Sequence, residues 1–123
     1  MKLIASVLRS LETFAGGKGA AIFILQETYR ETGANVEMTE RLINYPRSLV
    51  GVEVAVAFRQ LEEEGVFKVS FRSSGRADVN ALARRFGGGG HIHASGCTLR
   101  GALDEVKGKV YRAIEEIVAA NNG

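Results

Sequence analysis

Four consecutive glycines, Gly87 to Gly90, constrain this chain more than any other stretch of its sequence. Each glycine held in a folded structure costs about 0.5–1 kcal/mol relative to alanine, because more backbone freedom is lost, so the run costs about 2–4 kcal/mol. The net stability of a whole domain is only about 5–15 kcal/mol. The run must therefore serve a structural or a functional purpose.

Packing explains part of the run. Gly87 is expected to form a left-handed cap after a helix that follows Asp78 and ends at Phe86, and a hairpin turn would use one or two more glycines. Alternatively, backbone without side chains passes close to a ligand and offers it N–H groups, as glycine-rich loops do to phosphates. We favour phosphate binding for the remaining glycines, although the run matches neither the Walker loop nor the G-x-G-x-x-G spacing.

Length and composition limit the class of protein. With 123 residues, of which 46% are hydrophobic, the chain is expected to form one domain. No apolar run approaches the roughly 20 residues of a membrane span, and the single cysteine, Cys97, excludes an internal disulfide. We therefore expect a cytoplasmic protein with no membrane partner. The net charge of +2 is small, so anion affinity has to come from local clusters, such as Arg72, Arg76, Arg84 and Arg85.

Hydrophobic periodicity predicts helices and strands in alternation. Helices are expected at 3–14, 27–32, 39–45, 79–86 and 103–117, and strands at 20–26, 52–58, 67–71 and 91–99. The strand at 20–26 is expected to be buried on both faces, and the strand at 52–58 on one face. The strands at 52–58 and 67–71 should form an antiparallel hairpin. The predicted fold class is α+β, a mixed central sheet of about four to five strands flanked by helices.

Candidate binding side chains lie on both sides of the glycine run. Alternation along the preceding strand turns Arg72 away from its apolar side chains. Arg72 and Ser73 offer donors that suit phosphate, or they form a solvated strand end. His91 and His93 are two residues apart on a segment that is expected to be extended. Both side chains should therefore project to the same side. With Cys97 they form an H-x-H-x3-C set, but a structural zinc site needs a fourth ligand, and we expect Cys97 to be a small buried side chain.

The pattern of these residues resembles a known family. The segments Arg72-Ser73-Ser74, Asp78-Val79, Phe86-Gly-Gly-Gly-Gly-His91 and His93-Ala-Ser95-Gly96 resemble a family signature. This signature belongs to the C-terminal substrate-binding domain associated with DHH phosphoesterases. The branch that it resembles most contains bacterial oligoribonucleases that degrade nanoRNA and dephosphorylate adenosine 3′,5′-bisphosphate, and exopolyphosphatase-related proteins. The resemblance covers residues 1–123 as one domain. A related domain occurs in RecJ-type exonucleases and alanyl-tRNA synthetases.

The resemblance implies a division of labour between two domains. An N-terminal domain with an Asp-His-His motif holds two divalent metals, Mn²⁺ or Mg²⁺, and carries out catalysis, while the C-terminal domain holds the substrate. The residues that the resemblance assigns to phosphate are Gly88, Gly89, Gly90 and His91, those assigned to the nucleotide are Arg72 and Ser73, and His93 and Ser95 are further candidates. No Asp-His-His motif occurs in this sequence. The chain is therefore expected to hold no metal or catalytic residue, to be inactive alone, and either to be part of a longer enzyme or to act as a separate binding module.

The predicted function is to bind the phosphate and terminal nucleotide of a short oligonucleotide or a nucleotide bisphosphate, for hydrolysis by the metal domain. One alternative is an RNA-binding or tRNA-binding module without hydrolysis. Another is an interaction domain whose glycines only pack. A homodimer is a further option for its assembly.

Overall fold

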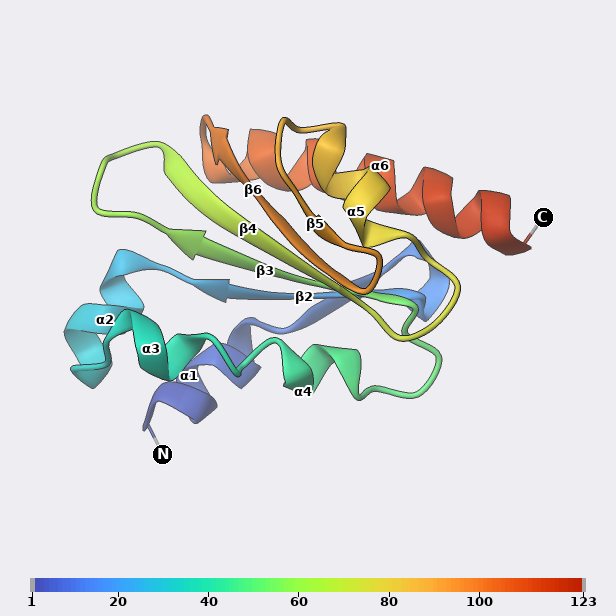
Figure 1. Cartoon of the computed structure of the whole chain (residues 1–123). Coiled ribbons are helices and arrows are strands. Elements are labelled where there is room, and N and C mark those ends of the chain that lie inside the picture. Colours follow the sequence, from blue (N-terminus) through green and yellow to red (C-terminus); the bar gives the residue numbers. More distant parts are fainter. Residues whose placement is uncertain (1, 123) are drawn as a thin grey trace.

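A six-stranded mixed sheet in the order β1-β2-β3-β4-β6-β5 separates two layers of helices in the computed structural model, which describes residues 2–122. The strands are β1 (Glu12–Phe14), β2 (Gly19–Ile24), β3 (Val54–Gln60), β4 (Val66–Ser73), β5 (Gly89–His91) and β6 (Ala94–Arg100). The helices are α1 (Lys2–Ser10), the 3-10 turn η1 (Ala15–Gly17), α2 (Gln26–Thr32), α3 (Val36–Thr39), α4 (Asn44–Arg47), α5 (Val79–Arg84) and α6 (Leu103–Asn122). Helices α1 to α4 lie on one side of the sheet, and α5 and α6 lie on the other (Figure 1). The predicted α+β class is confirmed, with more strands than expected.

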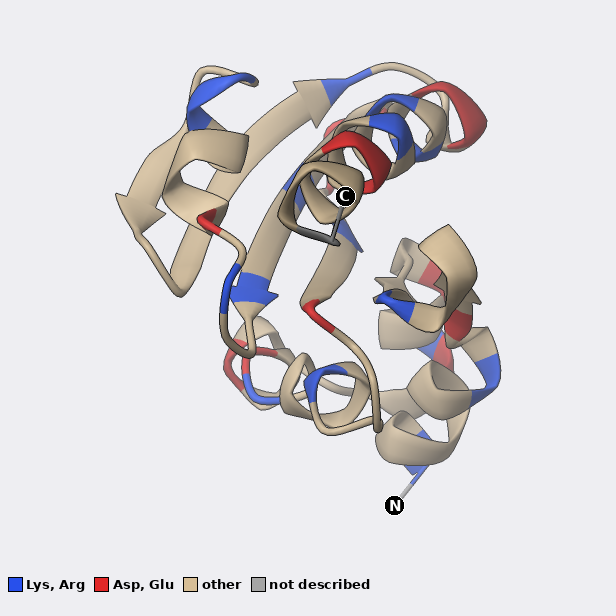
Figure 2. Ribbon diagram, turned by 90° about the vertical axis from the view of Figure 1, so that its right-hand side faces the viewer, with Lys and Arg blue, Asp and Glu red and all other residues tan. Residues whose placement is uncertain are grey.

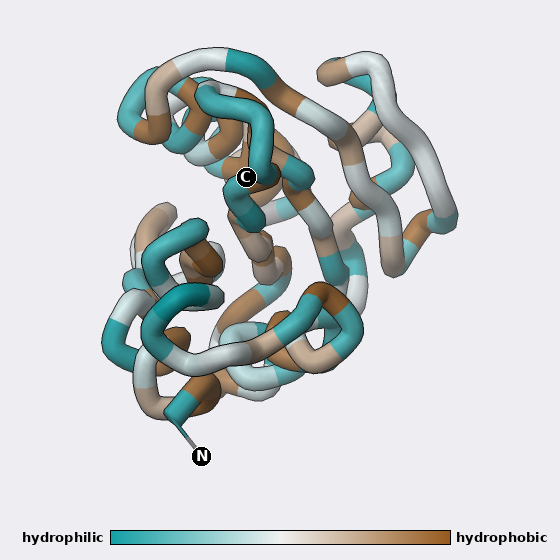
Figure 3. The backbone as a smooth tube through the Cα atoms, turned by 90° about the vertical axis from the view of Figure 1, so that its left-hand side faces the viewer, coloured by the Kyte–Doolittle hydropathy of each residue, from teal (hydrophilic) through white to brown (hydrophobic). Residues whose placement is uncertain are grey.

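The two central strands, β2 and β3, are parallel. Parallel neighbours need a long crossover, which α2, α3 and α4 supply. Every residue of β2 is buried, as predicted. The prediction that β3 is buried on one face is wrong, because the small side chains of Ala55 and Ala57 pack with Val7 and Ile43 from the helical layer. Figure 3 shows the apolar stretches of the chain in these inner strands.

The antiparallel hairpin of β3 and β4 is confirmed. In its register, Phe58 lies opposite Val69 and Val56 opposite Phe71, and all four side chains belong to the core beneath α5 and α6. The residues of β4 between them therefore face the side of α1 to α4, and Arg72 is one of them.

The first helix is shorter than its periodicity predicts, because it ends at Ser10. The hydroxyl of Ser10 accepts a hydrogen bond from the Phe23 N–H at 3.0 Å, and the chain turns into the edge strand β1. Phe14 stacks on Tyr111 of α6, with ring centroids 3.8 Å apart. These contacts with distant segments outweigh the local helical pattern.

The single helix predicted at 39–45 is also wrong. Residues 40–43 form a turn between two short helices, α3 and α4. Asn35 caps α3 by accepting a hydrogen bond from the Met38 N–H at 3.0 Å. Pro46 lies inside α4 rather than beyond a helix, in a first turn where its missing N–H is not needed.

The segment around the glycines departs from the prediction in two respects. Asp78 caps α5 as predicted, accepting from the Ala81 N–H at 3.0 Å. The glycine run, however, does not remain a loop, because Gly89 and Gly90 enter the edge strand β5. Ile92 and His93 then form a turn that reverses the chain into β6. The premise that His91 and His93 share one extended segment is therefore wrong.

Candidate functional site

His91 and Arg72 face the same side of the sheet in one row. The register pairs His91 of β5 with Ala94 of β6, and Ala94 with Arg72 of β4. Residues directly opposite each other share a face, and two strand spacings put the Cα atoms of His91 and Arg72 about 10 Å apart. Since the methyl group of Ala94 is all that lies between them in the row, the imidazole and the guanidinium can approach a common anion.

The four glycines of the run differ in whether, and why, the fold requires a glycine at their position. Gly87 has a positive φ of 81° after α5. A Cβ atom on Gly88 would lie 2.1 Å from the Gly96 carbonyl oxygen, and one on Gly90 would lie 2.6 Å from the Ala94 carbonyl oxygen. A Cβ atom on Gly89 would meet only the Asn80 side-chain oxygen, at 3.8 Å, and the φ of Gly89 is not in the left-handed region. The fold therefore requires three of the glycines, and Gly89, which is exposed, has room for a side chain.

Several N–H groups of the run already have partners within the fold. The Gly87 N–H donates to the Arg84 carbonyl at 3.1 Å, and the Gly88 N–H donates to the Ala83 carbonyl at 2.9 Å. The Gly90 N–H donates to the side-chain oxygen of Asn80 at 3.1 Å. Asn80 was not found from the sequence, because nothing in its local pattern shows that α5 brings it beside the run. A ligand at this edge therefore meets a preformed loop whose backbone is held in place.

The row of His91, Ala94 and Arg72 is the first candidate site. Beside it lies a second one, a hollow that contains Ser73 and His93, which we call the second hollow. It has a volume of about 550 Å³ and is lined by Arg47, Ser73, Ser74, Gly75 and His93. The Ser73 N–H donates to the His93 carbonyl at 3.0 Å, and the buried Ser73 hydroxyl accepts from the Gly75 N–H at 3.2 Å. His93 is exposed. The structure thus separates the two histidines, placing His91 in line with Arg72 and His93 at the end of β4.

Ser95 and Cys97 face the core side of β6. The Ser95 hydroxyl is buried and donates to the Val79 carbonyl at 2.5 Å, which joins β6 to α5. Cys97 is also buried, as predicted. Burial raises the pKa of its thiol to about 11, although the charge of Lys68 acts in the opposite direction. A thiol with this pKa is protonated at neutral pH and is a poor nucleophile.

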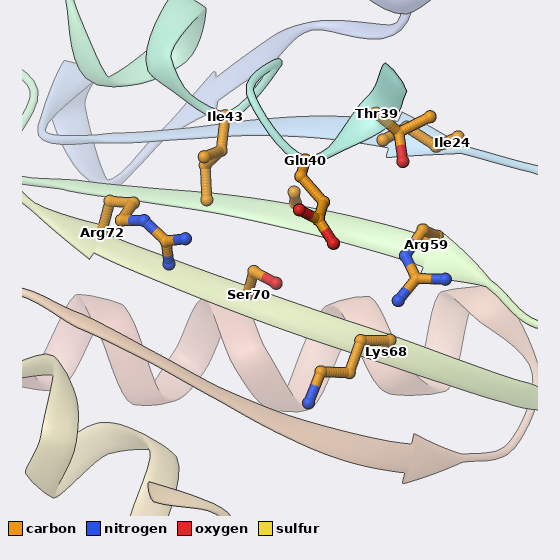
Figure 4. Close-up of a pocket in the computed structure, with 9 residues that line it drawn as sticks. Ile24, Thr39, Glu40, Ile43, Arg59, Lys68, Ser70 and Arg72 are labelled. Atoms are coloured by element: carbon orange, nitrogen blue, oxygen red, sulfur yellow. The ribbon is translucent and has the colours of Figure 1, made fainter. Parts of the chain in front are cut away.

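A cationic groove continues from Arg72 along the same side of the sheet. Its volume is about 200 Å³, and its polar lining comes from Arg59, Lys68, Ser70, Arg72, Thr39 and Glu40 (Figure 4). The sequence alternation did place Lys68 and Ser70 on the side of Arg72, but nothing in the sequence indicated that the turn after α3 would form the opposite wall.

Lys and Arg residues are interspersed with Asp and Glu along the ribbon of α6 (Figure 2). Among residues 2–122, no group of three or more His, Cys, Asp and Glu side chains is placed to hold a metal ion. Within the same residues, no helix is both long enough and apolar enough to span a membrane.

Comparison with known proteins gives two close relatives that carry the same name. Over 116 residues the chain is 34% identical to the bifunctional oligoribonuclease and PAP phosphatase NrnA of Thermus thermophilus. The matched stretch covers 94% of this chain and 34% of the relative. It is 30% identical over 99 residues to the protein of the same name from Bacillus subtilis. That matched stretch covers 80% of this chain and 30% of the relative. The chain thus spans about a third of the length of the curated relatives that it matches.

The fold agrees with a solved relative. An exopolyphosphatase-related protein from Bacteroides fragilis superposes with a TM-score of 0.81 at 29% identity, covering 94% of this chain and 33% of that chain. The family model of the DHHA1 domain matches residues 16–120, which is most of the chain. The resemblance to the domain associated with DHH phosphoesterases is confirmed, and this chain belongs to the DHHA1 domain family.

Proposed function

We propose that this chain binds the terminal phosphate and nucleotide of a short oligonucleotide or a nucleotide bisphosphate, and holds it for hydrolysis by an Asp-His-His domain. The observation that carries the proposal is the row of His91, Ala94 and Arg72 beside the exposed Gly89. An imidazole and a guanidinium face one side of the sheet there, with only small groups between them. The relatives named as oligoribonuclease and PAP phosphatase support the class of ligand.

Each group has a role that follows from its chemistry. Arg72 presents a planar set of N–H donors, which suits the oxygens of a phosphate. One of its terminal nitrogens already donates to the Phe71 carbonyl at 2.8 Å, which restricts the direction of the guanidinium. His91 adds a second donor, and Gly89 lets the phosphate approach the backbone. His93 and Ser73, at the neighbouring hollow, would contact the nucleotide.

The reaction itself is assigned to the partner domain. The proposed metals, Mn²⁺ or Mg²⁺, belong to the Asp-His-His domain and would generate the attacking hydroxide there. This chain supplies binding and orientation, so we expect it to be inactive alone.

An NMR titration with adenosine 3′,5′-bisphosphate tests the proposal. In the wild-type chain we expect shifts of the amides from Gly87 to His91 and of Arg72. Gly89→Val should abolish them while the chain stays folded, because a Cβ there has room. Gly108→Val is the matched control, since Gly108 lies on α6 across the sheet and its Cβ would meet only an Arg112 nitrogen at 4.0 Å. Equal binding by Gly89→Val and the control would contradict the phosphate site.

The contribution of His91 can be measured separately. His91→Ala should weaken bisphosphate binding by about 1–3 kcal/mol, the range for a charge-assisted hydrogen bond. Titration calorimetry on the variant and on His93→Ala gives the comparison. Unchanged affinity in His91→Ala with a loss in His93→Ala would move the phosphate contact to the second hollow.

A further inference from the structure

The cationic groove beyond Arg72 is not required by the site proposed above. On the side of the sheet that faces α1 to α4, the helices pack on β2 and β3 through the core cluster that contains Ile24, Ile43 and Ala57. Beyond this cluster, β4 carries Lys68, Ser70 and Arg72 on the same side. The groove lies between the turn after α3 and these three side chains (Figure 4).

Two cations in the groove face each other directly. The register pairs Arg59 of β3 with Lys68 of β4, and side chains that are directly opposite have Cβ atoms about 4.5–5.5 Å apart. Like charges in such a pair destabilise a sheet. Among the ion pairs formed by residues 2–122, none includes Arg59, Lys68 or Arg72. Arg59 and Lys68 thus bring two positive charges to this end of the groove, which a bound anion would offset.

The floor between the cations is smooth. The register aligns Gly89, Gly96, Ser70 and Ala57 in one row across four strands, next to the row of His91 and Arg72. The Lys68 ammonium extends toward this row, since its Nζ lies 3.6 Å from the position of a Cβ on Gly96. Small residues flanked by cations on both sides form a path that a chain of phosphates can follow across the exposed half of the sheet.

The far end of the path lies well away from His91, where the terminal phosphate is proposed to bind. Arg59 is three strands from His91 and four residues further along, so strand spacing and rise put their Cα atoms about 20 Å apart. A phosphate held between His91 and Arg72 therefore lies far from Arg59, whereas a longer strand can follow the groove from Arg72, which also lines it, and bring another phosphodiester to Arg59.

Building on the function proposed above, we propose that Arg59 and Lys68 form a second phosphate site, which binds an internal phosphodiester of an oligonucleotide whose terminal phosphate lies at His91. The site selects oligonucleotides over nucleotide bisphosphates. Glu40, which points over the strands between Arg72 and Arg59 (Figure 4), limits the affinity through its negative charge.

The test compares a 5′-phosphorylated triadenylate with adenosine 3′,5′-bisphosphate on the 123-residue chain. Arg59→Gln should lower triadenylate affinity about fivefold or more and change bisphosphate affinity by less than about twofold. Glu40→Gln should raise triadenylate affinity alone, which a variant that merely unfolds cannot do. Arg112→Gln, an exposed arginine on α6 across the sheet, is the matched control and should change neither affinity.

NMR shifts in the same titrations separate the two proposals. Shifts at Gly89 to His91 with both ligands, and at Arg59 and Lys68 with triadenylate only, support the second site. Shifts confined to the glycines, or an equal loss of both affinities in Arg59→Gln, overturn the second site and leave the first. Shifts at Arg59 without any at the glycines overturn the first site, and no shifts at millimolar ligand overturn both.

Discussion

At the residue scale, neighbouring glycines with the same chemistry have opposite structural demands. Gly88→Ala places a Cβ 2.1 Å from a carbonyl oxygen and 2.7 Å from the Cys97 Cβ. Since backbone must shift, we expect a loss of about 1–3 kcal/mol in the free energy of unfolding, as for other overpacked sites. Gly89→Ala should change it by less than about 1 kcal/mol. Urea unfolding of both variants measures the difference, and equal losses would contradict the assignment of Gly88 to packing and Gly89 to ligand approach.

Cys97 gives a second prediction at this scale. Its thiol is buried and its pKa is raised to about 11, mainly by burial. At pH 8 we therefore expect alkylation by iodoacetamide to be much slower in the folded chain than in urea, because both access and the thiolate fraction are low. Rates followed by mass spectrometry check this, and similar rates in the two states would show that β6 opens readily.

At the scale of elements, one polar cluster joins the edge strand β1 to α6. The Glu12 carboxylate accepts a hydrogen bond from the Tyr111 hydroxyl at 2.5 Å. It also forms an ion pair with the Lys107 ammonium at 2.5 Å. Partial burial raises the pKa of Glu12, but the hydrogen bonds from Lys107 and Tyr111 outweigh it and hold the pKa below its usual value of 4.5. Burial and the Glu12 carboxylate raise the pKa of Tyr111, which keeps its hydroxyl protonated as a donor.

The lowered pKa of Glu12 sets the pH dependence of this contact. A carboxyl group whose pKa is lower in the folded state stabilises the fold above its unfolded pKa, and the contribution is lost as the pH falls through the folded value. Glu12→Gln should therefore reduce stability at pH 7 and show less further loss below pH 4.5 than the wild type. Thermal unfolding across this pH range measures it, with Glu63→Gln, from an exposed pair with Arg100, as the control. Parallel curves for Glu12→Gln and the wild type would contradict the role of Glu12.

At the scale of the whole molecule, the salt dependence of binding would separate the proposed function from general RNA binding. The chain carries 16 Lys and Arg against 14 Asp and Glu, so binding depends on the cations of the site and groove. Two or three phosphate contacts to a single strand predict a slope of log K against log salt of about −1.4 to −2.1. Fluorescence anisotropy with a labelled triadenylate at several salt concentrations gives this slope. A slope that steepens steadily as the RNA is lengthened would favour an extended RNA-binding surface instead.

The sequence by itself determined the features that depend on neighbouring residues. The hairpin of β3 and β4, the outward direction of Arg72, the Asp78 cap and the helix after Leu103 follow from alternation, helical period and capping, all of which are local. The glycine run and its histidine also identified the family.

Only the tertiary structure decided which distant residues meet. The edge strands β1 and β5 are short and have no period of their own, so pairing with β2 and β6 defines them. The alignment of His91 with Arg72, the facing of Arg59 and Lys68, and the bond from Gly90 to Asn80 depend on register and packing between separate segments. A shift of one residue in any of these pairings would turn the side chains to the opposite face, and local sequence carries no record of that choice.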